Sequence, residues 1–266
     1  SADGIRLNGG ILRVAHSSAL GTAAGNASLS IRGDLGAVLE IDGTTANGNI
    51  TISGRVLDIT AADVNNAGVM GARGYLNRTS SEAVHTGTIR NLGGDNVITS
   101  PNDQVRLRAI GDNGNPTTFA IAVDAGSLAI QAGLTGLEND ATPTTATNRG
   151  IYKLGDGTLR YTGAAANNLT GITYVMNGVL ELDKTAGTNT ILGTAIVGDG
   201  IGGNGSEQLI VKQSNLIGDG IALTANPSGQ IVFAAGVTDM AGTPPPPRRG
   251  RGGGEWAEQG GGAPAR

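Results

Sequence analysis

Short runs in which apolar and polar residues alternate recur along the chain, and Gly, Asn or Asp bounds most of them. A period of two is typical of β-strands that bury one face. No stretch keeps apolar residues at helical spacing over three turns, and residues 61–70 are the nearest, weak match to a short helix. The pattern predicts an almost all-β protein. The expected strands are 29–31, 38–41, 49–52, 105–107, 128–130, 158–161, 179–182, 209–211 and 231–233.

One turn-and-strand unit occurs twice, far apart in the chain. An Asn-Gly turn opens residues 8–14 and again residues 177–182, and a Gly-containing loop follows each copy, at 19–23 and 191–195. A chain that repeats one such unit stacks its strands, whereas an antiparallel sandwich would account for short strands but not for the repeat. We therefore expect a parallel β-helix, that is, a β-solenoid, over residues 1–241.

The alternation also predicts which side chains point into this stack, because successive residues of a strand face opposite sides. Arg13 and Glu181 are expected to face solvent. The residues expected inside are Leu12, Val14, Ile31, Leu39, Ile41, Leu159, Leu180 and Leu182.

The composition further limits what kind of core the protein has and which partners it binds. Of 266 residues 46 are Gly, more than twice the average share of about 7%, and only 3% are aromatic, so small aliphatic layers must form the core. The net charge of −4 gives no electrostatic basis for binding nucleic acid. No apolar run approaches the roughly 20 residues of a membrane-spanning helix, so we expect no direct membrane insertion by this chain. The absence of Cys excludes disulfides and suits a secreted chain.

Residues 242–266 differ from the rest. They contain four consecutive prolines, then Arg-Arg-Gly-Arg-Gly-Gly and a Gly-rich end without apolar periodicity. Such a segment cannot bury a core, so we expect a disordered Pro/Gly/Arg-rich tail. Its single Arg-Gly stretch resembles RNA-binding segments, but one short copy on an acidic chain favours a linker.

The stretch 153–182 resembles the autotransporter-associated β-strand repeat. Lys153 is followed by Gly155-Asp156-Gly157-Thr158-Leu159-Arg160-Tyr161-Thr162-Gly163 and then by Val175-Met176-Asn177-Gly178-Val179-Leu180-Glu181-Leu182, close to that family's order of a Lys, G-x-G-T-L-x-L-T-G and V-N-x-G-T-L-x-L. Tyr161 replaces the usual aliphatic residue, and residues 167–171 depart from the usual N-T-Y-T-G. Residues 7–14 resemble the second half of another copy, and residues 89–96 resemble a segment found between copies.

This resemblance implies a passenger region of a type V secreted protein: a right-handed, single-stranded parallel β-helix on the bacterial cell surface. Such passengers are more often structural or adhesive stalks than enzymes. Their expected partners are glycans or proteins on host or neighbouring cells. A translocator β-barrel, which anchors the family in the outer membrane, is expected elsewhere in the full-length protein.

Candidate chemistry is sparse. His16 and His85 are the only histidines, so neither a transition-metal site nor a catalytic base is expected. Two strands carry paired carboxylates, Glu40 with Asp42 and Glu181 with Asp183, as glycoside hydrolases do, but alternation places both pairs on a solvated outer face. A polysaccharide-acting β-helix enzyme, a lyase or glycoside hydrolase, is the alternative function.

Residues 202–210 fit the calcium-binding nonapeptide G-G-x-G-x-D-x-U-x, except that Glu207 replaces Asp. Such sites need tandem copies so that neighbouring turns complete the oxygen shell, and this chain has a single copy. We therefore expect no catalytic residue, no cofactor and no metal.

Overall fold

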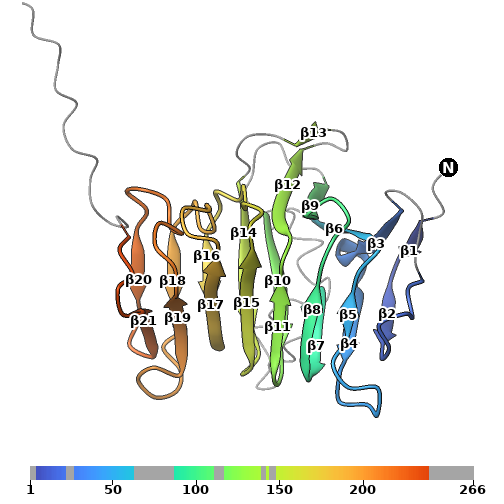
Figure 1. Ribbon diagram of the computed structural model, residues 1–266, viewed down its shortest axis with the longest axis horizontal. Helices are drawn as coiled ribbons and strands as arrows, with labels where there is room; N and C mark the ends of the chain where they lie inside the picture. Colours follow the sequence, from blue (N-terminus) through green and yellow to red (C-terminus); the bar gives the residue numbers. More distant parts are fainter. Residues whose placement is uncertain are drawn as a thin grey trace, which may run out of the picture.

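The computed structural model describes residues 4–21, 27–62, 87–110, 117–138, 142–143 and 148–239. Within these residues the fold is almost entirely β, with a single 3-10 turn, η1 (Gly33–Leu35), as its helical element. The strands lie side by side along the long axis of the molecule and follow the sequence from one end to the other (Figure 1).

The strands form three sheets. Sheet A contains β1 (Ile5–Leu7), β3 (Ser28–Arg32), β6 (Val56–Ala62), β9 (Gln104–Ile110), β12 (Gly133–Glu138) and β13 (Thr142–Pro143). Sheet B contains β2 (Gly10–Val14), β4 (Ala37–Asp42), β7 (Ile89–Gly93), β10 (Thr117–Val123), β14 (Arg149–Leu154), β16 (Thr173–Val175), β18 (Ala195–Val197) and β20 (Leu223–Ala225). Sheet C contains β5 (Thr51–Ile52), β8 (Asp95–Ile98), β11 (Ser127–Ile130), β15 (Thr158–Gly163), β17 (Gly178–Lys184), β19 (Glu207–Val211) and β21 (Gly229–Phe233).

The chain visits the sheets in turn. It passes from β3 in sheet A to β4 in sheet B and β5 in sheet C, and then returns to sheet A as β6, beside β3. After β12 and β13 it alternates between sheets B and C. Every strand pair among the described residues is parallel except β12 with β13. The prediction of stacked parallel strands is therefore confirmed, and an antiparallel sandwich is excluded. We call each passage of the chain around the sheets a rung.

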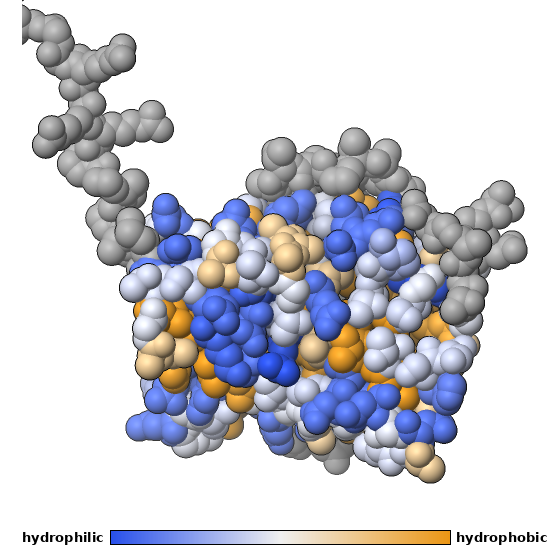
Figure 2. All heavy atoms as spheres, viewed as in Figure 1, coloured by the Kyte–Doolittle hydropathy of each residue, from blue (hydrophilic) through white to orange (hydrophobic). Residues whose placement is uncertain are grey.

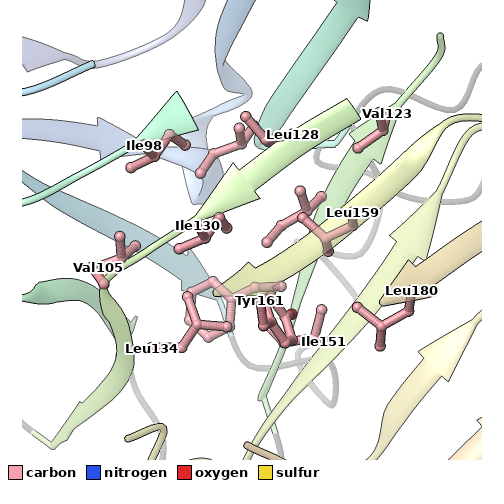
Figure 3. Packing of buried hydrophobic residues seen from close by; sticks show 14 of the residues in the cluster. Ile98, Val105, Val123, Leu128, Ile130, Leu134, Ile151, Leu159, Tyr161 and Leu180 are labelled. Carbon is pink, nitrogen blue, oxygen red and sulfur yellow. The ribbon is translucent and has the colours of Figure 1, made fainter. Parts of the chain in front are cut away.

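The core is a set of aliphatic rows that run from rung to rung. Leu128, Leu159, Leu180 and Leu209 occupy matching positions in β11, β15, β17 and β19, and each is fully buried. Figure 3 shows Leu128, Leu159 and Leu180 among side chains from neighbouring strands that point into the same interior. Burying one such side chain contributes roughly 1.5–3 kcal/mol.

The predicted inner residues are confirmed with one exception. Seven of them are buried, whereas Leu12 is only half-buried. The reason is its place in the stack: β2 is the end strand of sheet B and pairs with β4 alone, so no earlier strand covers it. The seven buried residues are Val14, Ile31, Leu39, Ile41, Leu159, Leu180 and Leu182.

All nine predicted strands are present, but several others were missed. In β10, Phe119 and Ile121 face the main core, while Ala120 and Ala122 form a second cluster with Leu154 on the opposite side of sheet B. A strand buried on both faces shows no alternation to detect. The nearest match to a short helix, residues 61–70, is not helical at its start, because Ala61 and Ala62 end β6. Its remainder, 63–70, lies outside the described residues, as do residues 240–266, which include the expected tail.

Candidate functional site

Glu40 lies at the centre of a chain of ion pairs that crosses sheet B. In the register of the sheet, Glu40 lies opposite Arg13 of β2 on one side and opposite Arg90 of β7 on the other. Arg13 Nη2 lies 2.8 Å from Glu40 Oε2, and Arg90 Nη1 lies 3.4 Å from Glu40 Oε1. Arg90 also contacts Asp124, with Nη2 2.7 Å from Oδ2. The Glu40 side chain is only 3% exposed, so two arginines both neutralise and cover it.

Glu181 has the same role on the outer face of sheet C. Arg160 Nε donates to its Oε1 at 2.8 Å, and Lys212 Nζ lies 2.9 Å from its Oε2. Arg160 reaches Asp183 as well, with Nη2 3.5 Å from Oδ2. Burial raises the pKa of Glu181, but hydrogen bonds from Lys212 and Arg160 lower it by more, so the net pKa lies below its ordinary value.

A third pair lies on sheet A, where Arg108 Nε is 2.5 Å from Asp58 Oδ1. Each sheet thus has a carboxylate that is held by a basic side chain from a neighbouring rung. Figure 2 shows one face of the molecule, with hydrophilic side chains gathered near the middle and hydrophobic ones on both sides. On each of the three sheets, ion pairs therefore join neighbouring rungs.

These contacts correct one prediction. Arg13 is exposed as expected, with 56% of its side chain accessible, but Glu181 is not solvated: 10% of its side chain is exposed. Both carboxylate pairs do face outward, and the first members, Glu40 and Glu181, are covered by basic residues of adjacent rungs. Alternation indicates the side of a sheet on which a residue lies, but it does not indicate what covers that residue.

The arrangement does not favour glycoside hydrolysis. That reaction requires one carboxylic acid with a raised pKa beside a second, free carboxylate. Here the pKa of Glu181 is lowered by its basic partners, and the pKa of Asp42 is lowered by hydrogen bonds from the Thr44 hydroxyl and main-chain N–H. A carboxylate stabilised in its charged form is a poor general acid.

Of the two histidines, only His16 lies among the residues that the structure describes. His16 is exposed in the turn after β2, where its Nδ1 accepts a hydrogen bond from the Ser18 main chain at 3.0 Å. His85 lies outside the described residues. Across the described part of the chain, no three His, Cys, Asp or Glu side chains are gathered as metal ligands, and no helix has the length and apolar character needed to span a membrane.

Two lysines are buried at the corners of the stack, a feature that alternation does not predict. Lys153, at the end of β14, donates to the main-chain carbonyls of Leu154 at 3.0 Å and Asn177 at 2.7 Å, and also to that of Gly155. Lys184 donates to the carbonyls of Ala132 at 3.1 Å and Thr162 at 3.0 Å. Each lysine therefore joins consecutive rungs.

Burial lowers the pKa of Lys153 to about 7, although the charges of Asp156 and Asp124 oppose this shift. For the same reason the pKa of Lys184 falls to about 8, against the charge of Asp103. The only sequence signal for these corners was the match of Lys153 to the lysine of the repeat pattern.

The first part of the nonapeptide 202–210 is the end of the loop before β19, and residues 207–210 lie in β19 itself. Gly202 and Gly205 have positive φ values of 101° and 81°, which only glycine adopts readily. Glu207 is buried, and its Oε1 accepts a hydrogen bond from the Ser206 hydroxyl at 2.8 Å. The acidic residue of the motif therefore points into the stack.

Comparisons with protein-family models, with characterised proteins and with solved structures found no match to this chain. The resemblance to the autotransporter-associated repeat thus rests on residues 7–14, 89–96 and 153–182 alone.

Proposed function

We propose that this chain is a non-enzymatic structural or adhesive stalk on the bacterial cell surface. In this proposal it is a passenger segment of an autotransporter, folded as a right-handed, single-stranded parallel β-helix. The three sheets of parallel strands, through which the chain passes in turn before each rung stacks on the one before it, support this fold. The repeat resemblance at residues 153–182 supports the passenger assignment.

The observation that carries the non-enzymatic proposal is the state of the outer carboxylates. Glu40 and Glu181 each contact two basic side chains, one from the rung before and one from the rung after. These contacts join neighbouring rungs along the stack. They leave neither residue free to exchange a proton with a substrate. A structural role accounts for all of these contacts, because each of them joins two neighbouring rungs.

Binding by such a stalk would use an extended face, with glycans or proteins of host or neighbouring cells as partners. The affinity would then be distributed over many weak polar contacts. Loss of any single outer polar side chain should leave adhesion of coated beads to target cells nearly unchanged, whereas loss of a single catalytic residue abolishes an enzyme's activity.

The decisive experiment measures turnover of pectin-like, glucan and xylan substrates, with the release of reducing or unsaturated ends as the readout. We expect none from the full chain. Product release that Glu181→Gln or Asp183→Asn abolishes would replace the stalk with the polysaccharide-acting enzyme. Val179→Ala, at an outer position of β17 that is more exposed and has no ion partner, is the control for nonspecific loss.

A further inference from the structure

The last strand of sheet C, β21, has one edge that no strand of the described residues pairs with. β21 pairs with β19 alone, and β20 ends sheet B in the same way. Both strands lie at one end of the stack, opposite the end that β1 and β2 occupy (Figure 1). An unpaired edge is a row of free main-chain N–H and C=O groups, which readily takes up a further strand.

Alternate residues of β21 supply the main-chain groups on this free edge. The Ser228 carbonyl and the Ala234 N–H form hydrogen bonds with β19. The direction of the main-chain groups alternates along a strand, so Gly229, Ile231 and Phe233 direct theirs away from β19. The free edge is therefore presented by the three residues of β21 whose side chains face inward, because they are the register partners of the inward residues of β19.

The side chains beside this edge are apolar and incompletely covered. Ile231 and Phe233 continue two inward rows that are fully buried in β19, yet Phe233 itself is 41% exposed. Ile231 is only partly buried against the core, as is Leu223 of β20. β21 contains no charged residue and no proline, which are features by which proteins protect an open edge. This end of the stack is thus an apolar surface bordered by a free strand edge.

Neither the following sequence nor the opposite end of the stack is suited to supply the missing strand. Residues 244–247 are four consecutive prolines, which have no N–H to donate and do not occupy central strands. The opposite end of the stack consists of β1 in sheet A and β2 in sheet B, whereas sheet C begins only at β5. A head-to-tail contact between two copies would therefore give β21 no strand to pair with.

We propose that β21 is the docking surface for a second copy of this chain, and that the two β21 strands pair antiparallel about a two-fold axis. Such a contact uses the same strand on both sides and needs no separate complementary surface. With Ile231 on the axis, the two Ile231 residues exchange N–H···O bonds, and the Phe233 N–H of each copy donates to the Gly229 carbonyl of the other. The Gly229 N–H keeps its own bond to the Asn226 carbonyl, at 2.8 Å.

The side chains of β21 fit this register. It places Phe233 of one copy opposite Gly229 of the other, on the inward side of the sheet. Gly229 has no side chain, so the aromatic ring can cover it, as aromatic residues do across from glycines in other sheets. The contact is confined to one end of a narrow stack, and we therefore expect a reversible dimer that forms as the concentration rises.

This proposal goes beyond the stalk function and can fail without affecting it. Its first test is sedimentation velocity of the full chain over a wide range of concentration. We expect the mass to rise from that of one chain to that of two, because mass action favours the dimer at high concentration.

Two substitutions remove different parts of the contact. Ile231→Pro removes the N–H on the axis without removing a bond to β19, and proline is tolerated on edge strands. Phe233→Lys places a charge on the apolar end. Each should weaken dimerisation roughly tenfold or more, while circular dichroism shows that the β-sheet is retained. Ile11→Lys is the matched control and should leave dimerisation unchanged, because Ile11 is an exposed apolar residue on the end strand at the opposite end.

A single cysteine reports the register of the two strands. The Cα atoms of an antiparallel hydrogen-bonded pair lie about 5.5 Å apart, within the range that a disulfide accepts. Ile231→Cys should therefore form a disulfide between two chains on mild oxidation. Gln230→Cys is the control: Gln230 is more exposed, but its counterpart in the other copy is displaced by two residues, about 7 Å along the strand.

Three results would overturn the proposal. They are the mass of a single chain at every concentration, loss of dimerisation in Ile11→Lys, and equal cross-linking of the Ile231→Cys and Gln230→Cys variants. If Ile231→Pro does not fold, Phe233→Lys and the two cysteine variants still decide between the outcomes.

Discussion

Replacing Glu181 with Ala tests the ion-paired outer face, because alternation alone predicts a silent substitution. Glu181 contacts Arg160 at 2.8 Å and Lys212 at 2.9 Å, and its own side chain is 10% exposed. The two basic partners are 36% and 39% exposed, so water can solvate them once the carboxylate is gone. Exposed pairs contribute about 0.2–1 kcal/mol each, and we therefore expect Glu181→Ala, which removes two of them, to lose about 0.4–2 kcal/mol.

The assay is urea denaturation at neutral pH, with Asp183→Ala as the control. Asp183 is 26% exposed and lies 3.5 Å from Arg160, so its removal should cost less than about 0.5 kcal/mol. Equal urea midpoints for the Glu181→Ala variant and the unaltered chain would refute the proposed cross-rung contact. In that case the outer carboxylates would not contribute to stability, and the core alone would hold the stack together.

The pH dependence adds a second, independent readout of Glu181. Because its pKa in the folded chain lies below the ordinary value of about 4.3, its contribution is present above that value. The contribution is lost as the pH falls through the folded-state pKa. The difference in stability between the unaltered chain and Glu181→Ala should therefore be full at pH 7 and should shrink in strong acid. A difference that does not change with pH would mean that the substitution acts through packing alone.

Two further predictions concern the interior. Leu180→Asp should unfold several rungs and cost more than about 4 kcal/mol, because it places an unpaired charge at a fully buried position whose neighbours depend on it. Loss of β-sheet circular dichroism measures the unfolding. A loss of signal no larger than that of Glu181→Ala would contradict the assigned faces. Burial lowers the folded-state pKa of Lys153 to about 7, so between about pH 7 and pH 10 the unfolded chain binds more protons than the folded chain, and stability increases with pH. Lys153→Met removes this group and should therefore flatten the rise of stability over that range. Urea midpoints at pH 7 and pH 9 measure the slope, and an unchanged slope in Lys153→Met would exclude this lysine as its source.

Alternation predicts a strand whose two faces differ, such as 179–182, but it does not predict β10, which is buried on both faces. The run at 179–182 alternates because Leu180 and Leu182 face the core while Val179 faces outward. In β10, by contrast, apolar neighbours lie on both sides of the sheet, so Phe119 to Val123 form one continuous apolar run. Period-two reasoning requires a difference between the faces, and this strand has none.

The polar contacts could not be predicted because they depend on register. Arg160 and Glu181 are partners only because β15 and β17 pair with these residues opposite each other, and the connection between them sets that alignment. Inward Lys153 and Glu207 break the rule that charged residues face outward. Both lie at corners, where main-chain oxygens or hydroxyls replace water. Corner positions become recognisable only after the rungs have been aligned.

The absence of cysteine allows the stacking of rungs to be tested directly by disulfide trapping. Thr158 of β15 is the register partner of Val179 in β17, which in turn pairs with Gln208 of β19, and all three are partly exposed. Neighbouring strands lie about 4.7–4.9 Å apart, within the Cα separation of 4.4–6.8 Å that a disulfide accepts.

The measurement is the extent of mild air oxidation, read by thiol labelling and mass spectrometry, in two double variants. We predict that Thr158→Cys with Val179→Cys forms an intramolecular disulfide in nearly every molecule. Thr158→Cys with Gln208→Cys, two rungs apart, should remain reduced. A Thr158/Val179 pair that stays reduced, or equal oxidation of both pairs, would contradict the parallel stack on which the proposed stalk depends.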